Sequence, residues 1–186
     1  MKQNVDGKPG SFRHSLFLVV MALVAAALAI PALAAASSGE CSTNPANREL
    51  DFWLGNWAVA YPGVTSGATS MVSLDLDKCL IVENWDGGHG HSGRNILAYS
   101  ADDKSWHGMF ADNEGRVHVF EGKVTSGVAE FQGPSVGPNG EAVLNRIKVI
   151  RKTSDEIEQL WEKSTDNGAN WKTVFQGEYS RRKSQK

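Results

Sequence analysis

Apolar and polar residues alternate along most of the chain from residue 57 onward, in short runs separated by residues that favour turns. Alternation with a period of two is typical of strands that bury one face, and glycine, proline, asparagine and aspartate mark the turns between them. Only residues 47–54 have a helical pattern, which predicts a single turn. The pattern predicts ten strands, over residues 57–61, 70–76, 80–86, 94–99, 105–111, 117–123, 128–132, 142–151, 156–163 and 171–181.

Ten strands in succession, without long helices between them, predict an antiparallel meander. A sheet of that length usually closes on itself, because closure removes the unpaired backbone groups of its two edges. We therefore predict an all-β fold, an antiparallel up-and-down barrel of about ten strands, over residues 49–182. Residues 37–48 form an extension before the barrel, and the basic residues 183–186 form a solvated tail.

The alternation also predicts which side chains face the inside of the barrel. The inward set combines many aromatic rings with a few polar groups, which is typical of a small-molecule pocket. The alternative is a filled barrel, in which inward polar groups such as Glu83 and Asn145 satisfy one another by hydrogen bonds. The predicted ligand-binding residues are Glu83, Trp85, Asn95, Tyr99, Trp106, Gln159, Trp161, Trp171, Phe175 and Tyr179.

The first residues have the organisation of a signal peptide. Basic residues precede an apolar run over residues 16–30, and Pro31 with a stretch of alanines follows. The run is shorter than the roughly 20 residues that span a bilayer, so cleavage is favoured over an uncleaved membrane anchor. We predict a cleaved signal peptide over residues 1–36, a secreted or periplasmic location, and no contact with a membrane after cleavage.

The charge balance argues against a nucleic-acid partner. The whole chain has 19 basic and 21 acidic side chains, and loss of the predicted leader changes its formal net charge from −2 to about −4. Nucleic acids and anionic membranes both attract basic surfaces. The expected partner is therefore a small molecule.

The chain has two cysteines, Cys41 and Cys79. In an oxidising compartment a cysteine pair is more often a disulfide than a metal site, so we predict a bond between them. The alternative is two free thiols. The bond would stabilise the fold by about 3–4 kcal/mol in the loop-entropy treatment of disulfides.

Histidines supply the candidates for a metal site. His89 and His91 have the His-x-His spacing of many zinc and copper sites. No carboxylate follows them closely, and the glycines around them favour an exposed loop, so we predict no metal. His107 and His118 could complete a site only if the fold brought them near. No histidine follows His118, as haem-binding barrels similar to nitrobindin would require, so we predict no cofactor.

Glu83 is the candidate for acid–base chemistry, alone or with Asp112 or Glu162. The sequence has no nucleophile elbow, phosphate-binding loop or Cys/His pair. A segment similar to the Asp-box of sialidase propellers occurs once, over residues 164–171, whereas a propeller repeats the box in every blade. That segment therefore predicts a hairpin turn, and the sequence favours a binding protein over an enzyme.

Residues 50–57, LDFWLGNW, resemble the FDFWxGxW opening of a family of secreted bacterial proteins known as a domain of unknown function. The resemblance implies a lipocalin-like, calycin-type barrel of about ten strands with no established activity. The chain departs from the family at Lys78, where glycine is usual, and at Gly108, where a polar residue, often glutamine, is common. Further similar segments, covering nearly all of the chain after the leader, lie at residues 78–85, 106–112, 159–162 and 164–179.

The aromatic cluster of Phe52, Trp53 and Trp57 is interpreted as the plug and first-strand anchor of the barrel, outside the ligand site. We predict a secreted or periplasmic protein that binds a small apolar or amphipathic molecule inside the barrel. Two alternatives stay open. One is a hydrolase or isomerase in which Glu83 is the acid or base, and the other is an envelope interaction protein without a ligand.

Overall fold

The structure is a computed structural model that describes residues 40–183. The predicted signal peptide over residues 1–36 lies outside the described residues, as does the end of the basic tail, 184–186. The described helices are all short: α1 (Glu40–Thr43) and the 3₁₀ helices η1 (Pro45–Arg48), η2 (Asp51–Trp53) and η3 (Leu76–Lys78).

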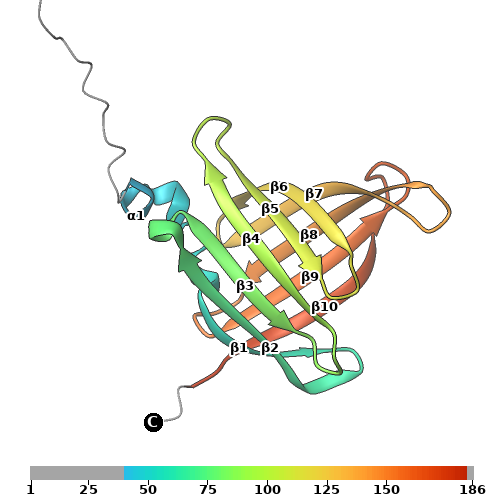
Figure 1. The fold of residues 1–186 in the computed structure, drawn as a ribbon, viewed down its shortest axis with the longest axis horizontal. Coiled ribbons are helices and arrows are strands. Elements are labelled where there is room, and N and C mark those ends of the chain that lie inside the picture. Colours follow the sequence, from blue (N-terminus) through green and yellow to red (C-terminus); the bar gives the residue numbers. More distant parts are fainter. Residues whose placement is uncertain (1–39, 184–186) are drawn as a thin grey trace, which may run out of the picture. The chain divides into compact units, whose positions relative to one another are not determined.

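Ten strands form the barrel, each antiparallel to its neighbours in sequence. They are β1 (Gly55–Tyr61), β2 (Val64–Asp75), β3 (Leu80–Asp86), β4 (Ser92–Ser100), β5 (Ser105–Asp112), β6 (Val117–Thr125), β7 (Val128–Val136), β8 (Ala142–Arg151), β9 (Glu156–Ser164) and β10 (Lys172–Arg181). β10 pairs with β1 and closes the sheet (Figure 1). In this pairing Trp57 lies opposite Arg181. The predicted all-β, ten-stranded up-and-down barrel is confirmed.

The strand bounds differ from the prediction at the start of β2, which begins at Val64 instead of residue 70, and at the end of β7, which continues past residue 132 through Pro134 to Val136. Proline lacks the N–H that a central strand needs, and it normally ends a strand or lies at an edge. Residues Glu121–Thr125 of β6 pair with Val128–Gln132 of β7. No β6 residue is paired with β7 beyond Gln132, so that side of β7 is a local edge. Pro134 therefore remains in the strand, paired with Leu144 of β8 on its other side.

The barrel has two different ends. Because neighbouring strands are antiparallel, the start of every odd-numbered strand lies at the same end as the finish of every even-numbered strand. We call the end at which β1 starts, with η2 and Trp57, the base. We call the opposite end, with Trp85 of β3 and Lys163 of β9, the mouth.

Leu50, Trp53 and Trp57 fill the base. All three are buried, and Nε1 of Trp57 donates a hydrogen bond of 2.9 Å to the carbonyl oxygen of Trp53. This packing agrees with the interpretation of the two tryptophans as plug and anchor. Phe52 is less enclosed: it packs against the core from the side, and the guanidinium carbon of Arg151 lies 5.7 Å from its ring centroid.

Gly55 leads the chain into β1 with a φ of +131°, a value that favours glycine. A Cβ atom there would lie 2.3 Å from Nη1 of Arg181. The same nitrogen donates a 2.9 Å hydrogen bond to the carbonyl oxygen of Leu54, and the guanidinium carbon lies 4.2 Å from the ring centroid of Trp57. The Gly-x-Trp pattern in the sequence thus leaves room for an arginine that seals the base.

The helical prediction for residues 47–54 is wrong in its details. Asn44 accepts a 3.1 Å hydrogen bond from the N–H of Ala46 and starts η1, which Pro45 favours as a first helical residue. η2 then follows as a separate 3₁₀ turn. Between the two turns lies Leu50, whose side chain is buried in the base, so the chain forms two turns instead of one.

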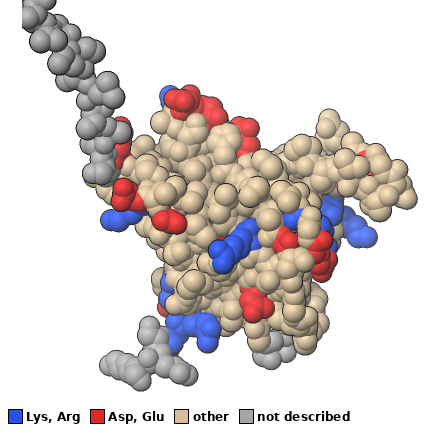
Figure 2. Space-filling model, viewed as in Figure 1, with Lys and Arg blue, Asp and Glu red and all other residues tan. Residues whose placement is uncertain are grey.

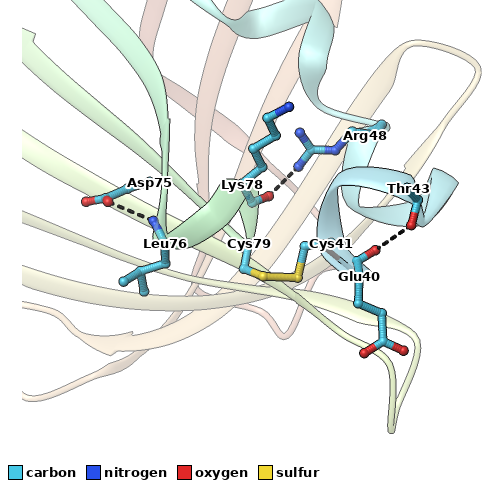
Figure 3. The surroundings of a disulfide bond; sticks show 8 residues. All are labelled: Glu40, Cys41, Thr43, Arg48, Asp75, Leu76, Lys78 and Cys79. Carbon is cyan, nitrogen blue, oxygen red and sulfur yellow. Dashed lines mark hydrogen bonds between the residues drawn. A yellow bond between two sulfur atoms is a disulfide. The ribbon is translucent and has the colours of Figure 1, made fainter. Parts of the chain in front are cut away.

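A disulfide joins Cys41 of α1 to Cys79, the residue after η3, and confirms the predicted pair (Figure 3). The bond closes a sequence separation of 38 residues, for which loop entropy contributes about 3–4 kcal/mol to the free energy of unfolding. Arg48 adds a second tie, because its guanidinium donates a hydrogen bond to the carbonyl oxygen of Lys78 (Figure 3). Both ties attach the segment that carries the plug to the turn between β2 and β3.

The surface of residues 40–183 has mixed charges. Figure 2 shows lysine and arginine side chains in small groups close to acidic ones on the visible face. Within the same residues, no helix is long and apolar enough to cross a membrane.

Candidate functional site

A cavity of about 290 Å³ opens at the mouth of the barrel. Small-molecule sites usually have volumes of roughly 300–1,000 Å³, so this volume counts against a drug-sized ligand and suits a compact one. The cavity is lined by Glu83, Trp85, His91, Asn95, Phe110, Asp112, Arg116, His118, Ile147, Gln159, Trp161, Lys163, Val174 and Phe175.

Aromatic rings form much of the wall. Trp161 of β9 meets Phe110 edge to face, with 5.7 Å between ring centroids, and meets His118 in the same way at 4.8 Å. On β3 and β10, the centroids of Trp85 and Phe175 lie 6.2 Å apart, also at nearly right angles. Such pairs are mutually stabilising and leave flat apolar faces for a ligand.

Glu83 of β3 lies in the floor of the cavity and is 2% exposed. Burial raises the pKa of its carboxyl to about 7, although hydrogen bonds from Ser70 and Asn95 act in the opposite direction. The Ser70 hydroxyl donates to Oε1 over 2.7 Å. At neutral pH the carboxyl is therefore divided between its protonated and ionised forms.

Gln159 adds an amide to the floor. The Tyr179 hydroxyl, buried below it in the core, donates a hydrogen bond to Oε1 of Gln159. Burial, together with the charge of Glu83, raises the pKa of Tyr179 well above its ordinary value. Tyr179 therefore stays protonated and holds the amide of Gln159 in one orientation.

Two polar atoms of the cavity wall are buried without a hydrogen-bond partner among residues 40–183: Oδ1 of Asn95 and Nδ1 of His118. A buried polar atom without a partner destabilises a protein by about 1–3 kcal/mol. Burial lowers the pKa of His118, and the positive charges of Lys163 and Arg116 lower it further against the opposing effect of Asp112. His118 is therefore neutral at pH 7.

Arg116 organises the acidic groups at the edge of the mouth. Its Nε lies 2.7 Å from Oδ2 of Asp112, and its Nη2 lies 2.9 Å from Glu114 and 3.0 Å from Nε2 of His91. Burial alone would raise the pKa of Asp112, but hydrogen bonds from the backbone and guanidinium of Arg116 lower it to about 2. The candidate ligand atoms of His91, Asp112 and Glu114 lie within 4.8 Å of one another. Because the guanidinium pairs with both carboxylates, we interpret this cluster as an ion-pair network and assign no metal to it.

The His-x-His segment is a turn and not an extended strand. His89 has a φ of +54° between two glycines that also have positive φ, and it is exposed outside the cavity. His91 lies at the cavity edge, where its ring meets Trp85 at 5.1 Å. His-x-His spacing directs both imidazoles to one side only when the backbone is extended, and this segment is not.

Trp171 lies outside the barrel, contrary to the predicted inward set. The register of β10 against β9 shifts between Thr173 and Phe175, so Trp171 and Phe175 do not share a face. The guanidinium carbon of Arg146 lies 4.0 Å from the Trp171 ring centroid, on the outer face of β8. An irregularity of one residue is enough to reverse the alternation.

Three other predicted ligand residues, Tyr99, Trp106 and Tyr179, do not line the cavity. Trp106 is buried towards the base, where its Nε1 lies 3.3 Å from Oε2 of Glu49, and the Tyr99 ring packs on it at 5.9 Å. Tyr179 supports Gln159 from within the core. The predicted residues that the fold brings together at the cavity are Glu83, Trp85, Asn95, Gln159, Trp161 and Phe175.

The prediction missed His118 because β6 reverses the usual pattern. Val117 and Val119 are 57% and 62% exposed, whereas His118 and Phe120 face inward. Valine is the residue that alternation would assign to the core. Phe110 and Ile147 carried a usable signal, since the alternation on β5 and β8 already directs both side chains inward.

No family model matches this chain, and no curated protein matches it. Membership of the family with the FDFWxGxW opening therefore stays a prediction.

Proposed function

We propose that this protein binds a compact, mainly apolar molecule in the mouth of the barrel, with a polar group of the ligand on the floor. The observation that carries the proposal is the combination of an aromatic wall with two buried polar atoms, Oδ1 of Asn95 and Nδ1 of His118, that have no hydrogen-bond partner among the described residues. A ligand that bonds to these atoms removes a cost of about 1–3 kcal/mol for each. The Cys41–Cys79 disulfide supports a location outside the cytoplasm.

The alternative of a filled barrel has less support. In a filled barrel the inward polar groups would satisfy one another by hydrogen bonds. Asn145 does so: its Nδ2 donates to the Ser135 hydroxyl over 2.7 Å, and its Oδ1 accepts from Nε1 of Trp161 over 3.0 Å. Asn95 lines the cavity, and its buried Oδ1 has no hydrogen-bond partner among residues 40–183. An unpartnered polar group in a cavity wall favours a ligand or solvent there.

Intrinsic fluorescence tests the proposal, because two of the six tryptophans, Trp85 and Trp161, line the cavity. A panel of small aromatic and aliphatic metabolites should include compounds that quench the emission saturably. Trp161→Phe should remove much of that signal. The matched control is Trp171→Phe on the outer face, which should leave both the signal change and the affinity intact. A protein that responds to no compound, or equally in both variants, would contradict binding in this cavity.

A second candidate function is an isomerase that moves a proton within a bound molecule. The observation that favours it is the position of Glu83 in the cavity with a pKa of about 7, where a carboxyl can take up a proton and return it at neutral pH. A hydrolase with paired carboxylates has less support. Asp112 is held ionised by Arg116, and Glu162 pairs with Arg146 on the outer face over 2.8 Å. If isomerisation occurs, Glu83→Gln should abolish turnover and leave binding within about threefold.

A further inference from the structure

The mouth of the cavity carries a pair of lysines, Lys163 and Lys172. Lys163 of β9 lines the cavity, and Lys172 of β10 is its direct cross-strand partner. Residues directly opposite each other on antiparallel strands point to the same face of the sheet, with Cβ atoms about 4.5–5.5 Å apart. Neither lysine forms an ion pair with any residue between 40 and 183.

This pair differs from the other positive charge at the mouth. Arg116 is bonded to Asp112 and Glu114, so its charge is already balanced. Like charges directly opposite each other on two strands are destabilising. An anion between Lys163 and Lys172 would relieve that repulsion, whereas a cation would increase it.

The charge of Lys163 acts on His118 in the cavity wall. Its Nδ1 is buried without a partner in the described part of the chain, and its ring lies in the wall beside Trp161. After burial, the charge of Lys163 is the largest cause that lowers the pKa of His118. The positive charge of Lys163 therefore acts on a group in the cavity wall.

The floor favours a neutral group. Glu83 and the unpartnered Oδ1 of Asn95 are both oxygen acceptors there, and they would repel an anion. A hydroxyl or N–H group of the ligand can donate a hydrogen bond to Oδ1 of Asn95. The carbonyl oxygen of protonated Glu83 can accept a hydrogen bond from the same group. The two ends of the cavity therefore select for different groups on the same molecule.

We propose that the ligand is a compact organic carboxylate, with its carboxylate held between Lys163 and Lys172 at the mouth and a neutral hydrogen-bond donor that reaches Asn95 on the floor. This inference rests on the proposed function and adds the chemical class of the ligand. The apolar part of the molecule lies between Trp161 and Phe175.

Four probes of similar size test this class by calorimetry on the whole mature protein. They are 4-hydroxyphenylacetate, its neutral amide, the cation tyramine, and phenylacetate, which lacks the hydroxyl. One charge-assisted hydrogen bond contributes about 1.5–3 kcal/mol, so the carboxylate should bind roughly 10- to 100-fold more tightly than the amide, and tyramine most weakly. Phenylacetate should bind more weakly than its hydroxylated relative.

Variants separate the anion site from the cavity itself. Lys163→Met with Lys172→Met should bring the carboxylate and the amide within about threefold of each other. The matched control is Lys104→Met, which removes an exposed lysine from the turn between β4 and β5 at the base and should keep the full preference. Asn95→Ala should reduce the advantage of the hydroxylated probe.

Two results would overturn the anion site while leaving the proposed function intact: equal binding of carboxylate and amide, or tightest binding of tyramine. Failure of all four probes to bind would also overturn it, because the site is defined by groups that these probes carry. The proposed function would then be judged by the fluorescence panel, in which Trp161→Phe and Trp171→Phe report on the cavity without reference to ligand charge.

Discussion

The base and the mouth of the barrel are formed by the same ten strands but are filled differently. At the base, Leu50 and Trp53 enter from the segment before β1 and complete a core around Trp57. At the mouth, none of the described segments enters the barrel, and Trp161 and Phe175 stay partly exposed around a cavity. One half of a barrel therefore becomes core, and the other a candidate site, according to whether the chain supplies a segment to fill it.

The largest expected difference between the two ends concerns stability. Trp57→Ala should lower the free energy of unfolding by about 3–5 kcal/mol, because it removes a fully buried ring and leaves a cavity. Trp161→Ala should cost less, since its ring already borders open volume. Guanidinium unfolding of both variants checks this. Equal losses would show that the mouth is packed like the base.

The disulfide should affect the base alone. Replacing Cys41 and Cys79 by serine should lower the free energy of unfolding by about 3–4 kcal/mol, because the unfolded chain regains loop entropy. The cavity lies at the other end, so affinity for any ligand found by fluorescence should stay within about twofold when measured well below the unfolding transition. A large loss of affinity in the folded variant would mean that the two ends are coupled.

Glu83 should make the mouth sensitive to pH. Its pKa is about 7 in the folded protein, above the ordinary value of 4.5, so between these pH values the unfolded chain releases a proton that the folded protein keeps. The free energy of unfolding is therefore highest below about pH 4.5 and falls by about 3 kcal/mol in total as the pH rises to about 7.

Glu83→Gln removes this titration and supplies the control. The difference in free energy of unfolding between the variant and the natural protein should move in favour of the variant by about 3 kcal/mol from pH 4.5 to pH 8. Parallel pH profiles for the two proteins would show that Glu83 has an ordinary pKa.

The smallest expected effect lies in the turn between β2 and β3. Lys78 has a φ of +71°, in the left-handed region that favours glycine, and it occupies the position where the resembling family usually has glycine. Lys78→Gly should raise the free energy of unfolding by about 0.5–1 kcal/mol. Lys78→Ala, which removes the side chain but keeps the backbone strain, should change it little. A gain of the same size in both variants would locate the effect in the side chain.

Much of the fold could be predicted because its signals are local. The predicted strands 80–86 and 142–151 match β3 and β8, since alternation and turn residues are written into each segment. The predicted strand 128–132 was too short, because whether a strand continues through Pro134 depends on the pairing of its neighbours. The bulge before Phe175 and the outward valines of β6 are likewise set by pairing across strands.

The site shows the same division. The residues that the structure brings to the cavity and that alternation places on the inner face are Glu83, Trp85, Asn95, Gln159, Trp161 and Phe175. Sequence reasoning could not separate them from Tyr99 and Trp106, which have the same inward direction but lie nearer the base. Alternation reports the face of a residue and carries no information on its height in the barrel relative to the plug.

By itself the sequence determined the barrel, the disulfide pair and the aromatic character of the interior, because period, turn chemistry and residue type are properties of neighbouring positions. Only the tertiary structure decided that the base is filled and the mouth hollow, that Trp171 lies outside, and that Lys163 faces Lys172 across two strands. These outcomes depend on contacts between residues far apart in the chain. Charge, burial and open volume at the mouth exist only once those contacts have formed.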